Sequence, residues 1–239
     1  MNLGDYEKRW RQKPILEKVY NDFFQRVQES RIPGLTVEIG GGLGKYGDYA
    51  GDVLVSDIQA TSGLDVCFDA LCFPFSDSTF SNIVGVDVLH HFQFPARFFK
   101  EASRALRHGG RLIFVEPAIT VGSFTFYRWF HHEPVRFIPL EGLFEECSTS
   151  DPYDSNQAIP TILASTAGNQ WLEQFGLRVA MIQYFGIFVY PLSGGFKKWS
   201  LIPKILFKPC LAIDQWLSKY LGKYLGFRML LVLEKVLPS

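Results

Sequence analysis

Hydrophobic residues along this chain follow two different spacings. Between residues 5 and 30 they recur every three or four positions, which is the spacing of one face of a helix. From residue 35 onwards, short β-branched and aromatic runs alternate with glycine-rich turns and helical stretches. The pattern predicts strands at 35–40, 52–58, 64–69, 81–89, 109–117, 177–185 and 227–236. It predicts helices at 5–30, 43–50, 95–107 and 168–175.

The alternation of strands and helices predicts an α/β fold, with a doubly wound, mostly parallel seven-stranded sheet covered on both faces. We divide the chain into an N-terminal helical segment, 1–34, and one domain over 35–239. Two parts of the domain break the alternation. Residues 118–165 are aromatic, contain several prolines and look irregular, and residues 186–226 form an apolar and basic insertion before the last strand.

A glycine-rich turn follows the first predicted strand, where residues 38–44 read Glu-Ile-Gly-Gly-Gly-Leu-Gly. Ligands of open parallel sheets bind beyond the carboxyl ends of the strands, and glycine lets a ligand approach the backbone closely. Glu38, Asp57 and Asp69 lie at the ends of the first three predicted strands, and they suit an amino group, two ribose hydroxyls and the exocyclic amine of adenine. Together they predict S-adenosylmethionine (SAM), an adenosine with a cationic amino-acid tail.

The same stretch also contains a G-x-G-x-x-G pattern, through Gly42, Gly44 and Gly47, which would fit a dinucleotide. A carboxylate beside a pyrophosphate is electrostatically unfavourable, and Glu38 therefore argues against that ligand. An NAD-dependent enzyme stays open as a weaker alternative.

Five motifs between residues 36 and 118 resemble, in their order and spacing, those of the class I SAM-dependent methyltransferases, in particular the branch similar to quinone-biosynthesis methyltransferases. They are EIGGGLG, VSDI, FDALCFPFSDSTFSNIV, VDVLHHF and LRHGGRLIFVEP. The resemblance implies the Rossmann-like sheet of that class and SAM as the cofactor. Because the motifs cover only part of the chain, they indicate the cofactor far better than the methyl acceptor.

The resemblance also implies that residues at the ends of the first four strands hold SAM. These are Glu38, Gly40, Gly42, Asp57, Ile58, Asp69, Ala70, Val86 and Asp87. The residues of the first strand and its turn would take the methionine part, and those after the second and third strands would take the ribose and the adenine. Val86 and Asp87 would lie under the transferable methyl group.

Methyl transfer to a hydroxyl or an activated carbon also needs a group that accepts a proton, and histidine suits that task near neutral pH. The candidates are His91, His90 and His132. A packing or orienting role is an open alternative for the first two, and a solvated loop for the third. In the class that the motifs resemble, the segment after the fifth strand often covers the acceptor, so 118–165 is expected to cover the substrate. Three of its residues are expected to contact the substrate: Arg128, Trp129 and Tyr153.

The charges of the chain are unevenly distributed, although 24 basic and 24 acidic residues cancel overall. Residues 1–176 carry 15 basic and 22 acidic side chains, whereas residues 177–239 carry 9 and 2. The acidic first part disfavours nucleic acid as a partner. Within 186–226, six lysines are interleaved with aromatic residues. This segment is expected to make a peripheral membrane contact or to grip a lipophilic or lipid-linked acceptor, and a lid or a dimer interface is an open alternative.

The N-terminus is polar and of mixed charge, unlike a secretory signal, and no apolar run approaches the ~18–20 residues that span a bilayer. We therefore expect a cytoplasmic protein, with any peripheral contact at the inner face of the membrane. The four cysteines form no C-x-x-C pair and have no histidine at metal spacing, which predicts reduced thiols and no metal ion.

The expected function is methyl transfer from SAM to a hydroxyl or activated carbon of a small lipophilic or lipid-linked acceptor. The alternative is a non-catalytic SAM-binding module that uses its hydrophobic C-terminal part as a surface for a protein partner.

Overall fold

The computed structural model describes residues 3–92, 94–130, 133–144 and 155–236. The strands are β1 (Thr36–Glu38), β2 (Leu54–Asp57), β3 (Val66–Cys67), β4 (Phe80–Val86), β5 (Leu106–Pro117), β6 (Leu177–Phe185) and β7 (Arg228–Lys235). The α-helices are α1 (Leu3–Gln12), α2 (Pro14–Ser30), α3 (Lys45–Ala50), α4 (Pro95–Ala105), α5 (Val121–Phe130), α6 (Ile159–Leu163), α7 (Thr166–Glu173), α8 (Val189–Ser193) and α9 (Phe207–Leu225). The 3₁₀ helices are η1 (Leu89–His91), η2 (Leu140–Leu143) and η3 (Lys204–Leu206).

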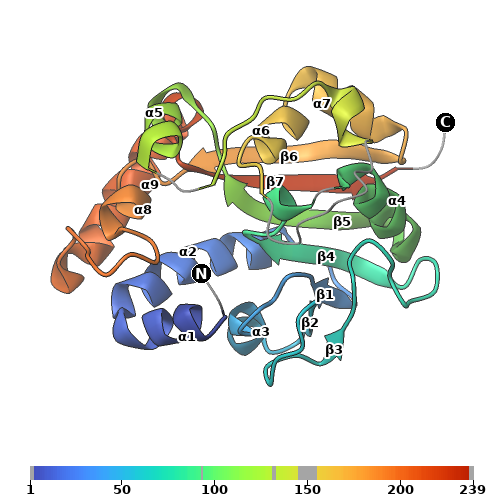
Figure 1. Ribbon diagram of the computed structural model, residues 1–239, viewed down its shortest axis with the longest axis horizontal. Helices are drawn as coiled ribbons and strands as arrows, with labels where there is room; N and C mark the ends of the chain where they lie inside the picture. The colour runs from blue at the N-terminus through green and yellow to red at the C-terminus, as the bar shows by residue number, and fades with distance from the viewer. Residues whose placement is uncertain (1–2, 93, 131–132, 145–154, 237–239) are drawn as a thin grey trace.

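The seven strands form one sheet in the order β3-β2-β1-β4-β5-β7-β6 (Figure 1). Strands β1 to β5 pair in parallel, with Val37 opposite Ile83, whereas β7 runs antiparallel to both β5 and β6. The predicted doubly wound, mostly parallel sheet is therefore confirmed. Because β2 and β4 lie on opposite sides of β1, the topological switch point falls at the end of β1, where ligands of such sheets bind.

Helices cover both faces of the sheet, and each face has its own core (Figure 1). On one face, α4 and α7 pack on the strands through Phe98, Phe99 and Leu172. On the other face, α2 packs on β5 and β7, mainly through Leu16 and Phe23. The sheet is thus buried between two apolar layers, as its continuous hydrophobic strands require.

The N-terminal helix expected at 5–30 is in fact two helices, and that prediction was wrong at Lys13. Pro14 has no amide hydrogen and restricts the backbone of the residue before it, so Lys13 is extended (φ −128°, ψ 79°). Lys13 Nζ donates hydrogen bonds to the carbonyl oxygens of Gly195 (2.5 Å) and Lys197 (2.9 Å). These two hydrogen bonds attach the break between α1 and α2 to the segment that leads to α9.

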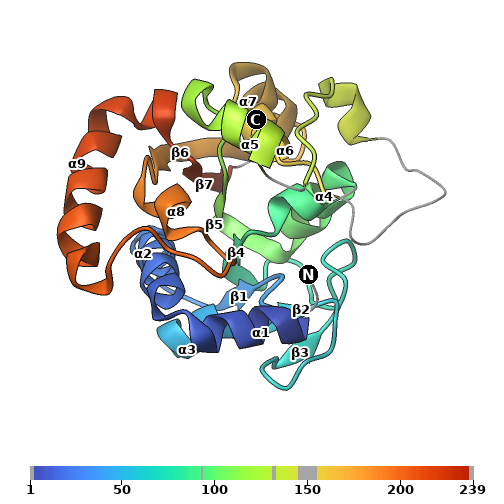
Figure 2. The same cartoon turned by 60° about the vertical axis from the view of Figure 1, so that its left-hand side comes forward.

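The two parts of the chain that break the alternation contain helices, which the sequence pattern did not predict. Residues 118–165 include α5 and α6, and residues 186–226 include α8, η3 and the 19-residue α9, which lies at the edge of the molecule (Figure 2). Only three residues of α9 are buried. Its apolar residues lie on more than one face, so their spacing along the sequence gives no clear signal of an amphipathic helix. Over the described ranges, no helix has the length and hydrophobicity needed to cross a membrane.

Candidate active site

A cavity of about 450 Å³ lies beyond the carboxyl ends of β1, β2 and β4, at the topological switch point. At one end it is lined by the glycine-rich turn after β1 together with Asp57. At the other end it is lined by His90 and His91 and by aromatic side chains of α1, α2 and α5. We refer to these as the cofactor end and the acceptor end of the cavity.

The glycine-rich turn at the cofactor end is fixed by backbone hydrogen bonds. Gly40 and Gly42 have positive φ angles, 64° and 52°, which L side chains rarely adopt. The amide of Gly41 donates to the carbonyl oxygen of Ser56 (2.8 Å), and the amide of Gly42 donates to Oδ2 of Asp57 (2.9 Å). A Cβ atom on Gly40 would come within 2.4 Å of Val88 Cγ2. The turn therefore needs glycine for its own geometry, whatever binds above it.

Glu38 lies below this turn and is 4% exposed. None of the described residues donates a hydrogen bond to its Oε2 atom, although that atom is buried. Burial raises the pKa of Glu38 to about 8. An unpartnered buried carboxyl oxygen beside the cavity fits the amino group of SAM, in agreement with the residue's expected role.

Among the residues at and after the ends of β2 and β3 that were expected to bind SAM, only some line the cavity. Asp57 lines the cavity, and its Oδ1 atom accepts a hydrogen bond from the amide of Gln59 (2.9 Å). A carboxylate has about four acceptor positions, so Asp57 keeps capacity for ribose hydroxyls beside its two backbone partners. Ile58, Asp69 and Ala70 are not among the described residues that line the cavity, and Asp69 Oδ1 accepts a hydrogen bond from the amide of Leu71 (2.8 Å). Their contacts with the adenine stay a prediction.

Val86 and Asp87 lie where β4 ends, between the two ends of the cavity, and both line it. Asp87 has a φ of 57°, which is unusual for a residue other than glycine. Its carboxylate accepts hydrogen bonds from the hydroxyl of Tyr20 (2.6 Å) and from the Nη2 atom of Arg228. Burial acts to raise the pKa of Asp87, but the guanidinium of Arg228 and the neighbouring His90 outweigh it and lower that pKa. Asp87 is therefore a partly buried carboxylate whose charge the buried Arg228 compensates.

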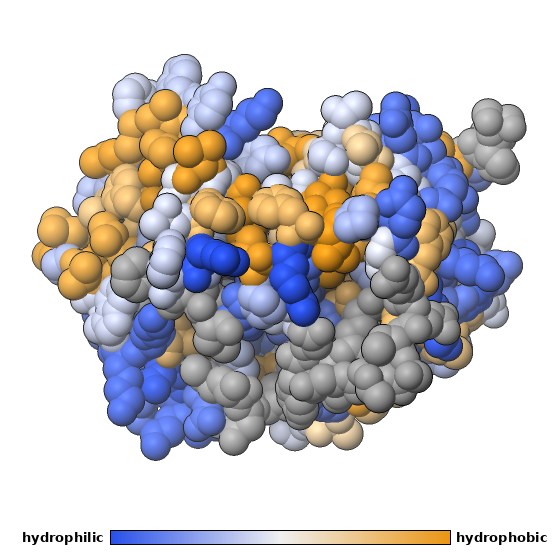
Figure 3. All heavy atoms as spheres, turned by 45° about the horizontal axis from the view of Figure 1, so that its top comes forward, coloured by the Kyte–Doolittle hydropathy of each residue, from blue (hydrophilic) through white to orange (hydrophobic). Residues whose placement is uncertain are grey.

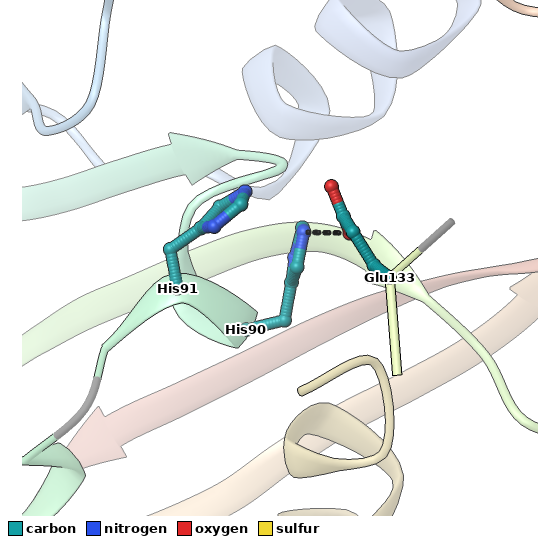
Figure 4. Close-up of side chains that lie close together, drawn as sticks. All are labelled: His90, His91 and Glu133. Carbon is teal, nitrogen blue, oxygen red and sulfur yellow. Dashed lines mark ion pairs between the residues drawn. The ribbon is translucent and has the colours of Figure 1, made fainter. Parts of the chain in front are cut away.

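His90 is buried between two carboxylates, those of Glu116 and Glu133, of which Figure 4 shows the second. Its Nδ1 atom lies 2.6 Å from Oε2 of Glu116, and its Nε2 atom lies 3.4 Å from Oε2 of Glu133. Burial opposes protonation of the ring, but Glu116 and Glu133 prevail and raise the pKa of His90 to about 10. Glu116 is itself fixed, because its Oε1 atom accepts hydrogen bonds from two consecutive backbone amides after β4. His90 is thus an imidazolium at neutral pH.

His91 has the opposite electrostatic character. Its ring centroid lies 4.2 Å from that of His90 (Figure 4). Burial, together with the positive charge of His90, lowers the pKa of His91 below its usual value. His91 is therefore neutral near pH 7 and, unlike its neighbour, can accept a proton.

The acceptor end contains residues that the sequence did not single out. Tyr6 and Trp10 of α1, Tyr127 of α5, Tyr190 of α8 and Arg228 of β7 all line it. They belong to elements that are far apart in sequence, so no short motif could have revealed them. The amphipathic pattern of the N-terminal segment was the one available signal, and it indicated only a buried helix face.

Of the four remaining predicted residues, two do not line the cavity and two lie outside the described part of the chain. Arg128 and Trp129 lie on α5 but are exposed, and among the described residues it is their neighbours Phe126 and Tyr127 that line the cavity. His132 and Tyr153 lie outside the described residues. The contacts of these four residues with a substrate stay a prediction.

His90, His91 and Glu133 also bring three potential metal-ligand atoms within 4.8 Å of one another. The sequence analysis did not anticipate this cluster, because it predicted no metal ion. His90 already has a carboxylate at each ring nitrogen, which explains the arrangement without an ion.

Comparisons with known proteins agree with this geometry. A family described as "Methyltransferase domain" matches residues 39–114. A human protein named "Probable tRNA methyltransferase 9B" is 35% identical over an alignment of 105 residues. The alignment covers 37% of this chain and 22% of that protein. The chain thus spans about a fifth of the length of this relative.

Two crystal structures of SAM-dependent methyltransferases share the fold. One, from Thermotoga maritima, is 17% identical, with a TM-score of 0.57 over 97% of this chain and 95% of that one. The other, from Archaeoglobus fulgidus, is 12% identical, with a TM-score of 0.52 over 96% of this chain and 97% of that one. The predicted class I methyltransferase fold is confirmed, and residues 39–114 match a methyltransferase domain. The expectation that nucleic acid is not a partner, in contrast, finds no support, because the human relative is named for tRNA.

Proposed function

We propose that this chain, in which residues 39–114 form a methyltransferase domain, transfers a methyl group from SAM to a hydroxyl or an activated carbon of a small lipophilic or lipid-linked acceptor. One observation carries the proposal. A single cavity joins the glycine-rich turn after β1 to a chamber lined by aromatic residues, and a neutral histidine, His91, lines that chamber.

SAM, when bound, supplies the methyl group as an electrophile. The protein then has to hold the acceptor in line and to take its proton. We assign the second task to His91, because its pKa is lowered and its ring lines the cavity. The hydroxyl proton of the acceptor passes to a ring nitrogen of His91 while the acceptor oxygen gains the methyl group.

His90 has a different role in this proposal. Its raised pKa keeps it protonated, and its two carboxylate partners leave no ring nitrogen free to accept a proton. It is a positioning residue that fixes the 3₁₀ helix η1 and keeps a positive charge beside His91. That charge is one of the two reasons why His91 stays neutral.

The lining of the acceptor end supports an apolar acceptor with one polar group. Aromatic rings of Tyr6, Trp10, Phe126, Tyr127, Tyr190 and Phe196 surround it. Ligand sites of this kind bury most of the ligand against apolar walls and orient it by a few polar groups. Here Arg228, His91 and Gln157 are polar groups of that kind.

Two measurements test the proposal. Calorimetric titration with SAM or its demethylated product, S-adenosylhomocysteine, should give heat of binding, whereas NAD should give none. Incubation with methyl-labelled SAM and alkylated phenols or quinols should then move the label into the organic phase. Binding of NAD instead of SAM would contradict the cofactor, and transfer of the label to tRNA would contradict the lipophilic acceptor.

A second candidate function is a non-catalytic SAM-binding module with a surface for a protein partner. It is favoured by the exposed aromatic side chains of α9. Binding of SAM without transfer to any acceptor tested would support it.

A further inference from the structure

Exposed hydrophobic residues gather on η3, α9 and the neighbouring α5. They are Val121, Phe124, Trp129, Ile205, Leu206, Ile213, Trp216, Tyr220 and Tyr224. Figure 3 shows hydrophobic residues concentrated at the end of the molecule where Figure 1 places α5 and α9. Scattered exposed apolar residues are normal for a protein surface, but a contiguous group of this size indicates an interaction site.

Within this group, α9 presents an ordered stripe. Ile213, Trp216, Tyr220 and Tyr224 follow one another at intervals of three and four residues, which places them on one side of the helix. Their exposed fractions lie between 54% and 68%, and the rings of Trp216 and Tyr220 are 5.7 Å apart. We call this stripe, together with Lys219 and Lys223, the docking face.

The opposite side of α9 is firmly attached to the domain. Asp214 is buried, and its carboxylate accepts hydrogen bonds from the backbone amides of residues 187, 188 and 189, at 3.1, 2.8 and 2.7 Å. Gly222 lies so close to β6 that a Cβ atom would come within 2.3 Å of the carbonyl oxygen of Tyr184. The docking face is therefore held outward by the packing of its own helix.

The charge next to the stripe has one sign. Between residues 199 and 225 the chain contains four lysines, Lys204, Lys208, Lys219 and Lys223, and one acidic residue, the buried Asp214. By helical spacing, Lys219 and Lys223 lie along one edge of the aromatic stripe. The exposed surface of η3 and α9 thus combines aromatic rings with positive charge and offers no exposed carboxylate to balance it.

We infer that the docking face binds the surface of an anionic lipid bilayer. Tryptophan and tyrosine side chains are favoured at the level of the lipid headgroups, and lysines beside them are attracted to anionic lipids. A second copy of the chain would bring these lysines toward one another, whereas an anionic surface complements them. The inference does not depend on methyl transfer, because it rests on α9 and η3 alone.

Docking in this way would bring the cavity close to the lipid. Trp199 precedes η3 by a few residues, is partly exposed and also lines the cavity, as does Phe196. The segment between α8 and α9 therefore connects the docking face to the acceptor end.

Flotation of the full-length protein with vesicles tests the inference, in the absence of SAM and of any acceptor. We expect binding to vesicles of phosphatidylcholine with phosphatidylglycerol, and little binding to phosphatidylcholine alone. The double variant Lys219→Gln/Lys223→Gln should weaken partitioning into anionic vesicles roughly 30-fold, since each lysine near such a surface contributes about fivefold. Trp216→Ser/Tyr220→Ser should weaken it at least as much by removing the apolar contact.

Matched controls are Lys100→Gln on α4 and Leu35→Ser before β1, both exposed and outside the docking face. These should bind vesicles like the natural sequence. Equal recovery with neutral and anionic vesicles, or equal losses in the controls, would overturn the inference. A dimer in solution that Trp216→Ser/Tyr220→Ser converts to a monomer would also overturn it, because a second copy would then cover the face.

Discussion

The cofactor end and the acceptor end of the cavity are built in different ways. The cofactor end consists mainly of backbone, from the turn at residues 40–42 to the end of β2, and its hydrogen bonds join residues that are close in sequence. The acceptor end consists of side chains, and two of them, Tyr6 and Arg228, come from opposite ends of the chain. The first end is thus defined by local geometry and the second by the packing of distant elements.

This difference has a physical consequence for substitutions. A backbone site tolerates many side-chain changes but not a Cβ atom at a crowded glycine. A site made of packed side chains loses its shape when one buried partner is removed.

Replacing Arg228 should damage the acceptor end most severely. Arg228 is 1% exposed, donates to Asp87 and lies over the rings of Phe23 (4.9 Å) and Tyr190 (5.0 Å). Arg228→Met leaves the partly buried Asp87 without its counter-charge, and we expect the free energy of unfolding to fall by about 3 kcal/mol in urea titrations, the lower end of the range for a buried pair. The matched control is Arg178→Met, which breaks an exposed pair with Glu234 and should cost less than about 1 kcal/mol.

The double variant Asp87→Asn/Arg228→Met sharpens this test. With both charges removed, much of the lost stability should return. If the single and the double variant unfold at the same urea concentration, the uncompensated carboxylate is not the cause.

Replacing His91 should affect turnover rather than cofactor binding. We expect His91→Asn to lower kcat by about 10²–10³-fold, the usual contribution of a general base, with the affinity for S-adenosylhomocysteine unchanged. In the natural protein the pKa of His91 is lowered, so its ring stays neutral down to a pH below the usual pKa of histidine. At saturating SAM, kcat should therefore stay constant from pH 8 to about pH 6.5 and fall only under more acidic conditions. An unchanged kcat in His91→Asn would remove this residue from the mechanism.

Gly40 tests the cofactor end through its backbone. Gly40→Ala places a Cβ atom against Val88 at a positive φ, and we expect it to destabilise the fold by about 2–4 kcal/mol and to weaken the binding of S-adenosylhomocysteine. Gly51→Ala is the matched control, because Gly51 has a φ of 76° but no atom within 4 Å of the added Cβ. It should cost only about 1–2 kcal/mol. Thermal unfolding and calorimetry measure both effects, and equal losses would show that crowding at Gly40 has no role.

The contrast between the two ends also explains what could be predicted from sequence. The strands of the sheet and the turn at residues 38–44 follow from local hydrophobic runs and glycine positions, and their predicted places agree with the structure to within a few residues. Asp57 was identified because it ends a strand, and strand ends meet at one edge of a parallel sheet, whereas Asp87 was identified through the resemblance to the methyltransferase class.

The acceptor end could not be predicted because its residues share no local pattern. Arg228 begins the last strand and looks like an ordinary basic residue until β7 is placed beside β5. Glu116, which sets the charge of His90, lies in a strand that reads as continuous core. Lys13 and Pro14 divide the N-terminal segment in a way that the helical spacing on either side conceals. In each case the deciding interaction joins residues separated by many positions in the chain.

Glu38 is the residue of the cofactor end that we expect to contact the amino group of the ligand, and the effect expected from its titration is the smallest. Its pKa of about 8 means that the carboxyl is protonated at pH 7 before the ligand binds, and that the amino group of SAM or S-adenosylhomocysteine must displace the proton. At pH 7 binding should therefore release about one proton, and affinity should rise roughly fivefold between pH 7 and pH 8 and level off near pH 9 at about tenfold (~1.4 kcal/mol) above its value at pH 7. Calorimetry in two buffers of different ionisation enthalpy counts the proton. The control is Glu38→Gln, which has no proton to release. Its binding enthalpy should not depend on the buffer, and its affinity should not rise between pH 7 and pH 8. If the natural protein behaves in the same way, Glu38 is already ionised or does not face the amino group.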